Sequence, residues 1–147
     1  MSSLGAKQQF GSRPILGVGG LVFDNGRVLL VRRGVAPAKG YWSIPGGKLR
    51  MGETLTEGVE RELFEETGLH VRVGALVEVY ERLPRRVGTG AHYVVLDYLC
   101  EVTGGSLRAG DDAEEAQWLP VDGLGGLPLT PGAAEVIQKA HRMAAGN

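Results

Sequence analysis

Two stretches near the start of the chain, residues 14–23 and 27–33, are rich in Val, Leu and Ile, and Asp24-Asn25-Gly26 separates them. Such apolar runs bounded by turn residues are typical of β-strands. Asn-Gly supplies the positive φ angles that a tight hairpin turn requires. The pattern predicts an antiparallel hairpin, followed by a loop at 34–41 and a short strand at 42–45.

After a predicted turn at Gly46-Gly47 the apolar spacing changes to the helical period, carried by Leu55, Val59 and Leu63. Thr54 followed by Glu57 has the Thr-x-x-Glu form of a capping box. Gly68 stands where a glycine commonly ends a helix. These signals predict a short, well-anchored helix over residues 54–67 that buries one apolar stripe.

The second half of the chain continues in strand-like patterns, which predict strands at 70–83, 92–102 and 116–120. A polar loop at 83–90 joins the first two of these strands. The segment 103–115 is rich in Gly and Asp and predicts a longer loop. Cys100 falls inside the second predicted strand, where we interpret it as a small strand residue and not as a nucleophile.

A terminal helix is predicted after Thr130-Pro131, because these residues make a good cap and first turn. Its apolar positions would close the core, and they are Val136, Ile137, Ala140 and Met143. The order of elements predicts one mixed α/β domain over residues 14–147. Residues 1–13 are expected to form a disordered tail.

The composition excludes several classes of protein. The 147 residues hold 16 basic and 17 acidic side chains, so no global field would attract nucleic acid or an anionic membrane. A single cysteine excludes an intrachain disulfide, and no apolar run of about 18 residues could span a bilayer. We therefore expect a cytoplasmic protein without nucleic-acid or membrane partners.

Three carboxylates, those of Glu62, Glu65 and Glu66, are predicted on one side of the 54–67 helix. Like charges at this spacing repel each other, and a bound cation would remove that penalty. Carboxylate oxygens are the preferred ligands of hard ions such as Mg²⁺ and Mn²⁺. The alternative is a solvated acidic helix face. At about 100° per residue the acidic stripe adjoins the apolar one, which favours a partly desolvated site.

Residues 47–69, GKLRMGETLTEGVERELFEETGL, resemble the signature of the Nudix hydrolase family. That signature is Gly, five residues, Glu, seven residues, Arg-Glu, an aliphatic, any residue, Glu-Glu, any residue, Gly and an aliphatic. The residues that fill it are Gly47, Glu53, Arg61, Glu62, Leu63, Glu65, Glu66, Gly68 and Leu69. The resemblance implies the family's α/β/α sandwich, a mixed sheet between helices, over nearly all of residues 14–144. It also implies hydrolysis of a nucleoside diphosphate linked to another moiety, with a divalent cation.

The resemblance assigns the metal, Mg²⁺ or Mn²⁺, to carboxylates at matching motif positions, namely Glu62, Glu66 and Glu65. We expect the backbone carbonyl of Gly46 to complete the protein's ligands, because a side chain there would obstruct a close approach of backbone, cation and phosphate. A simple tight turn is the alternative for Gly46. Arg61 and Glu53 are expected to pair and to orient the ligands.

The general base has two locations in the family. Some members use the helix residue that matches Glu62, and others use an acid in a distant loop. The loop candidates here are Asp111, Asp112, Glu114 and Glu115. We choose Asp112 and Glu115, although each of the four has an alternative as a solvated turn residue.

Substrate contacts are predicted at several basic and aromatic positions. Arg32 and Arg33 alternate along one strand, so only one of them can face a site, and an exposed edge charge is the alternative for either. Tyr41 and Trp42 could stack on a base or pack in the core. Pro84 falls fifteen residues after Leu69, where a proline in the family marks enzymes that cleave ADP-ribose. Further along the same loop, two arginines could meet a ribose or a phosphate, and they are Arg85 and Arg86.

The sequence therefore favours hydrolysis of ADP-ribose to AMP and ribose 5-phosphate. One alternative is a nucleoside triphosphate pyrophosphohydrolase, including one that acts on oxidised nucleotides. Another is a non-catalytic module that senses a nucleotide, although such a module has no need of a full set of metal-binding carboxylates. A homodimer is expected because many short family members are dimers.

Overall fold

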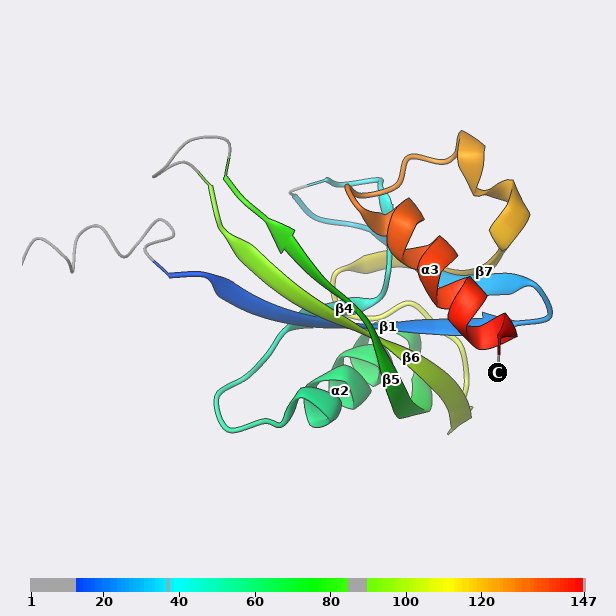
Figure 1. Ribbon diagram of the computed structural model, residues 1–147, viewed down its shortest axis with the longest axis horizontal. Helices are drawn as coiled ribbons and strands as arrows, with labels where there is room; N and C mark the ends of the chain where they lie inside the picture. Colours follow the sequence, from blue (N-terminus) through cyan, green and yellow to red (C-terminus); the bar gives the residue numbers. More distant parts are fainter. Residues whose placement is uncertain (1–12, 37, 85–89, 147) are drawn as a thin grey trace, which may run out of the picture.

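A mixed sheet of seven strands forms the centre of the molecule (Figure 1). The structure is a computed structural model that describes residues 13–36, 38–84 and 90–146. The strands are β1 (Ile15–Asp24), β2 (Arg27–Arg33), β3 (Trp42–Ser43), β4 (Gly46–Lys48), β5 (Leu69–Arg82), β6 (Tyr93–Gly105) and β7 (Ala113–Pro120). The helices are α2 (Leu55–Thr67), the short 3₁₀ helix η2 (Val121–Gly126) and α3 (Ala133–Ala145). The predicted tail at 1–13 lies outside the described residues except for Arg13.

The strands are ordered β3-β2-β1-β6-β5, with β4 paired to β1 and β7 paired to β2. β1 and β6 run parallel, and the other pairs are antiparallel. The predicted hairpin between β1 and β2 is confirmed, because Asn25 and Gly26 adopt φ angles of 51° and 75° at its turn. The sheet thus has β1 at its centre, paired with three strands, β2, β4 and β6.

Helices cover both faces of this sheet, which confirms the predicted α/β/α sandwich (Figure 1). On one face Val59 and Leu63 of α2 pack against a buried cluster that includes Val18, Val22 and Leu29. On the other face Ile137 and Ala140 of α3 pack against a cluster that includes Leu21, Val28 and Leu30. Neighbouring residues of β1 and β2 alternate between the clusters because successive strand side chains point to opposite faces.

The predicted capping of α2 is present at both ends. The Thr54 hydroxyl accepts a hydrogen bond from the Glu57 N–H at 3.1 Å, and the Glu57 carboxylate accepts one from the Thr54 N–H at 2.8 Å. Gly68 adopts a left-handed φ of 76°, and its N–H donates to the Phe64 carbonyl at 2.9 Å. These bonds satisfy orphan backbone groups at the helix ends and hold α2 in place on the sheet.

Three sequence-based predictions of local structure are wrong. Gly46 and Gly47 belong to strand β4 and not to a free turn, because they pair with Gly19 and Val18 of β1. Strand β7 begins at Ala113 instead of residue 116, because β2 offers pairing partners along its whole length. Thr130 does not cap α3. The helix begins after Gly132, which has a left-handed φ of 83°, and the Thr130 carbonyl accepts from the Ala133 N–H.

The prediction that Cys100 is a strand residue agrees with the structure. Cys100 is buried within β6, and burial raises the pKa of its thiol to about 12, which suits a packing residue and not a nucleophile. In the described part of the chain, every helix is too short or too polar to cross a bilayer.

Candidate active site

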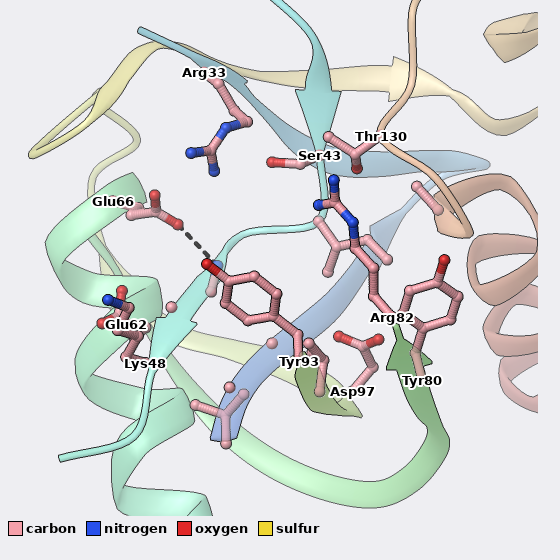
Figure 2. A pocket seen from close by; sticks show the side chains of 18 of the residues that line it. Arg33, Ser43, Lys48, Glu62, Glu66, Tyr80, Arg82, Tyr93, Asp97 and Thr130 are labelled. Carbon is pink, nitrogen blue, oxygen red and sulfur yellow. Dashed lines mark hydrogen bonds between the residues drawn. The ribbon is translucent and has the colours of Figure 1, made fainter. Parts of the chain in front are cut away.

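A cavity of about 850 Å³ extends from α2, across the centre of the sheet, to the segment that precedes α3 (Figure 2). The strand segments between these two ends carry little side-chain volume, because Gly17, Gly19, Gly46 and Gly47 all line the cavity. The carboxylates of Glu62, Glu65 and Glu66 line its α2 end. The predicted acidic helix therefore faces a cavity and not only bulk solvent.

Glu66 is the most buried of the three carboxylates. Its Oε1 accepts a hydrogen bond from the Gly46 N–H at 2.8 Å, which joins α2 to β4. Desolvation raises the pKa of the Glu66 carboxyl to about 7; the Gly46 hydrogen bond opposes this shift, and the negative charge of Glu62 adds to it. Burial also raises the pKa of Glu62, although its contact with Arg61 opposes the rise.

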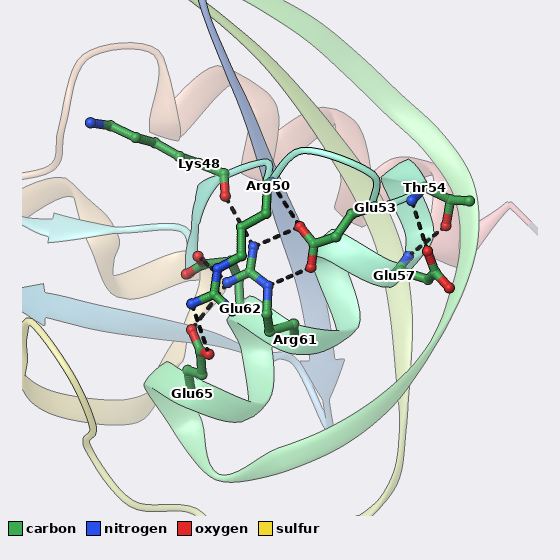
Figure 3. Close-up of polar contacts among 8 residues, drawn as sticks. All are labelled: Lys48, Arg50, Glu53, Thr54, Glu57, Arg61, Glu62 and Glu65. Carbon is green, nitrogen blue, oxygen red and sulfur yellow. Dashed lines mark hydrogen bonds and ion pairs between the residues drawn. The ribbon is translucent and has the colours of Figure 1, made fainter.

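Arg61 holds the other carboxylates in position (Figure 3). Its guanidinium forms a bidentate pair with Glu53, at 2.5 Å from Nε and 2.9 Å from Nη2. Its Nη1 donates to Glu62 at 2.7 Å and to Glu65 at 3.1 Å, and its Nη2 also donates to the Lys48 carbonyl at 3.0 Å. The hydrogen bond to Arg61 lowers the pKa of Glu53 to about 2, and the same pairing raises the pKa of Arg61.

The structure shows why neither glycine of β4 can carry a side chain without displacing its neighbours. A Cβ atom on Gly46 would overlap the Val18 carbonyl oxygen and the Gly19 Cα of β1, so glycine is required there for strand packing. A Cβ atom on Gly47 would overlap the Glu62 carboxylate. Gly47 is therefore the residue that makes room for a predicted metal ligand.

The residues present fit a hard divalent cation. Buried, mutually repelling carboxylates and nearby backbone carbonyls are oxygen donors, and a cation would offset their charge. Among the described residues, no three acidic, histidine or cysteine side chains are already gathered as a ligand set. Binding would therefore require these carboxylate side chains to come closer together than they lie here.

The two acids chosen as alternative general bases lie in different places. Asp112 lines the cavity together with Asp111, and the Gly110 N–H ties their loop to the Glu66 carbonyl at 3.1 Å. Glu115 is not among the residues that line the cavity, because it lies on β7 directly opposite Arg32 and forms an ion pair with it at 2.5 Å. Glu114 contacts the same arginine at 3.2 Å. The structure does not bring Glu115 to the α2 carboxylates.

Only some of the predicted substrate-binding residues lie at the cavity. Arg33 lines the cavity, whereas Arg32 pairs with the acids of β7, as strand alternation requires. Trp42 is only 8% exposed and packs in the core cluster beneath α3, so its predicted stacking on a base is wrong in this structure. Pro84 does not line the cavity. Arg85 and Arg86 lie outside the described residues.

Several residues of the cavity were missed from the sequence. They come from β5, β6 and the loop before α3, and they include Tyr80, Arg82, Tyr93, Asp97 and Thr130 (Figure 2). One sequence signal could have found Asp97, because it is the single charged residue in the apolar run YVVLDYLC. The others carry no local signal, since either face of a strand can hold a tyrosine or an arginine.

The chain matches a known protein family over most of its length. The NUDIX domain family matches residues 13–140, and the chain belongs to that family. The chain is similar to an ADP-ribose pyrophosphatase of Methanocaldococcus jannaschii, with 40% identity over 111 residues, 76% of this chain and 64% of the relative. It is also similar to a human 8-oxo-dGDP phosphatase, with 33% identity over 101 residues, 66% of this chain and 29% of the relative.

The fold is matched by a solved structure as well. The crystal structure of a MutT NUDIX hydrolase from Burkholderia pseudomallei superposes with a TM-score of 0.78 at 30% identity. The match covers 87% of this chain and 98% of that one. By contrast, the chain spans 64% and 29% of the two curated relatives named above, less than two thirds of either.

Proposed function

We propose that this protein is a metal-dependent pyrophosphohydrolase that converts ADP-ribose to AMP and ribose 5-phosphate. The observation that carries the proposal is the gathering of Glu62, Glu65 and Glu66 at one end of a cavity that also exposes Arg33. The size of the cavity suits a nucleotide, since small-molecule sites commonly enclose about 300–1,000 Å³. The similarity to an ADP-ribose pyrophosphatase supports the choice of substrate.

Mg²⁺ or Mn²⁺ is the proposed cofactor, with Glu62, Glu65, Glu66 and the Gly46 carbonyl as its ligands. When bound, the ion would neutralise charge on the bridging phosphates and acidify a water molecule. Arg61 and Glu53 would orient Glu62 and Glu65 through the bonds described above. Arg33, whose positive charge acts to lower the pKa of Glu66, would bind a phosphate oxygen near the same carboxylates.

The chemistry requires a base near the attacking water. As the water oxygen bonds to phosphorus, one bridging P–O bond breaks, and a carboxylate accepts the water's proton. Glu62 and Asp112 both line the cavity, so we keep them as the two candidates. Glu115 is set aside because its carboxylate is paired with Arg32 outside the cavity lining.

A second candidate function is hydrolysis of oxidised nucleotides, including triphosphates, and the similarity to the human 8-oxo-dGDP phosphatase favours it. A substrate panel with Mg²⁺, its products separated by chromatography, tests both functions. We expect a higher kcat/KM for ADP-ribose than for ATP, dGTP, 8-oxo-dGTP or 8-oxo-dGDP. The Glu66→Gln variant serves as the control for contaminating hydrolases. More efficient cleavage of an oxidised nucleotide would overturn the ADP-ribose assignment.

Two further proposals concern the setting of the protein. We propose a homodimer, which sedimentation equilibrium would test, because a monomeric mass across the micromolar range would contradict it. We also propose a cytoplasmic location, supported by the single cysteine, which suits a reducing compartment.

A further inference from the structure

Asp97 is a buried acidic residue in the cavity wall that the proposed metal chemistry does not use. It lies on β6, is 4% exposed and lines the cavity between the rings of Tyr93 and Tyr80 (Figure 2). Strand register explains this placement. Tyr93 and Asp97 share one face of β6, and they pair with Arg82 and Glu78 of β5.

The neighbouring strand leaves the Asp97 carboxylate accessible to a ligand. Gly19 of β1 pairs with Asp97, and a Cβ atom on Gly19 would overlap the Asp97 Oδ1. Gly17 holds the equivalent position beside Val95. Because Gly17 and Gly19 have no side chains, the part of β1 beside Val95 and Asp97 does not cover this face of β6. Asp97 is the acidic residue of β6 that lies there.

No described residue donates a hydrogen bond to the Asp97 carboxylate or forms an ion pair with it. The charge that acts on Asp97 is that of Glu78, whose own partner is Lys139 of α3 at 2.6 Å. Burial raises the pKa of Asp97 to about 7, and the negative charge of Glu78 adds to this effect. A buried carboxyl without a partner destabilises the folded protein, so packing does not explain it.

We infer that Asp97 recognises the adenine of the substrate by accepting a hydrogen bond from its exocyclic amino group. A carboxyl oxygen can accept this bond whether or not the group is protonated. Tyr80 and Tyr93 line the same wall, and aromatic rings are common stacking partners of a base whose edge is read by hydrogen bonds. Gly132 makes room for the Tyr80 ring, because a Cβ atom there would overlap it.

The distance to the proposed metal site agrees with this assignment. Gly46 pairs with Gly19, and Gly19 pairs with Asp97, so two strand spacings separate β4 from Asp97. At about 4.8 Å per spacing this is roughly 10 Å, which leaves room for a phosphate and a ribose between the metal and the base. The inference rests on the proposed function, because it assumes an adenine nucleotide with its phosphates near α2.

A cycle that combines a variant with a substrate analogue tests the contact. The kcat/KM values of wild type, Asp97→Val and Asp97→Asn are measured with ADP-ribose and with the analogue whose 6-amino group is replaced by hydrogen. We expect wild type to prefer ADP-ribose by about 10–100-fold, and Asp97→Val to reduce this preference to about twofold or less. Asp97→Asn should keep most of the preference, because its amide oxygen still accepts a hydrogen bond.

Two results would overturn the inference. One is an equal loss with both substrates in Asp97→Val, which would indicate a general structural role. The other is a wild-type preference that depends on the 2′- or 3′-hydroxyl of the adenosine ribose and disappears in Asp97→Val, which would assign Asp97 to the sugar. Thermal unfolding should show Asp97→Val and Asp97→Asn to be at least as stable as wild type. Glu101→Gln, an exposed acid of the same strand, is the matched control and should change neither measurement.

Binding of AMP separates the inference from the proposed function. Calorimetry is carried out with AMP and with purine riboside 5′-monophosphate, which lacks the amino group. It measures, without hydrolysis, the coupling between Asp97 and the 6-amino group, which is the part of the binding preference for AMP that Asp97→Val removes. If ADP-ribose is not cleaved but AMP binding shows the coupling, the proposed substrate is wrong and the role of Asp97 holds. If ADP-ribose is cleaved and neither measurement shows the coupling, the role of Asp97 is wrong and the proposed function holds.

Discussion

Arg61 is the residue on which the geometry of the acidic cluster depends. One guanidinium contacts Glu53, Glu62 and Glu65, and its short bonds to Glu53 leave Nη1 directed at the other two carboxylates. Glu66 lies apart from this network and is held by a backbone N–H instead. Within the cluster, Glu62 is thus positioned by the charged guanidinium of Arg61, and Glu66 is positioned by a neutral backbone N–H.

The different partner of Glu66 leads to a prediction for Glu66→Gln. The variant should lose at least about 100-fold in kcat, because a neutral amide is a weak ligand for Mg²⁺. Its stability without metal should equal or exceed that of wild type, since the amide oxygen can still accept from Gly46 and a desolvated charge is removed. Steady-state kinetics and thermal unfolding without divalent ions measure the two effects. Wild-type activity at saturating Mg²⁺ would disprove the ligand assignment.

Strand β4 determines how α2 meets the rest of the cavity. Its two glycines look equivalent in the sequence, but their surroundings differ. The missing Cβ of Gly46 faces backbone atoms of β1, whereas that of Gly47 faces the Glu62 carboxylate. Backbone cannot move without disturbing the sheet, while a carboxylate at the end of a side chain can.

We therefore predict opposite outcomes for alanine at these two positions. Gly46→Ala should destabilise the fold by about 1–3 kcal/mol or more, because backbone atoms of β1 must shift. Gly47→Ala should fold with little loss of stability but lose at least about tenfold in kcat, because Glu62 is displaced. Urea unfolding and kinetics measure the two variants. Gly104→Ala, with nothing near its added methyl group, is the control. Equal activity of Gly47→Ala and wild type would contradict the role given to Glu62.

At the scale of the whole molecule, the cavity joins elements that are distant in the chain. The carboxylates come from α2, the polar and aromatic wall comes from β5 and β6, and the loop before α3 closes one end. At the α2 end of the cavity, burial raises the pKa of both Glu62 and Glu66, so keeping both groups ionised is unfavourable without a cation. Divalent-ion binding should therefore affect the stability of the entire domain.

We predict that Mg²⁺ or Mn²⁺ is required for activity and raises the unfolding temperature. Binding to the folded state alone should add about 2.7 kcal/mol at a concentration one hundred times Kd. Ca²⁺ should support activity poorly, because it prefers more ligands and longer bonds than a compact octahedral site offers. Activity assays and thermal scans with each ion, and with excess chelator, measure these effects. Full turnover in excess chelator would contradict the prediction, and Glu66→Gln should lack the thermal shift.

The sequence by itself determined the parts of the protein that depend on neighbouring residues. The hairpin turn at Asn25-Gly26 and the capped α2 follow from local φ angles and from bonds between residues three apart. The placement of Glu62, Glu65 and Glu66 on one side of the helix follows from the helical period. The motif at residues 47–69 is also a pattern of residues close together in the chain, and it pointed to the family to which the chain belongs.

Only the tertiary structure decided which side chains of the strands reach the cavity. Alternation separates Arg32 from Arg33, but the pairing of β2 with β7 determines that Arg32 meets Glu115 and that Arg33 faces the cavity. Likewise, the register of β6 between β1 and β5 brings Asp97 to the cavity wall. A shift of one residue would turn every side chain of a strand to the other face. That register depends on contacts between segments far apart in the chain, which no local pattern specifies.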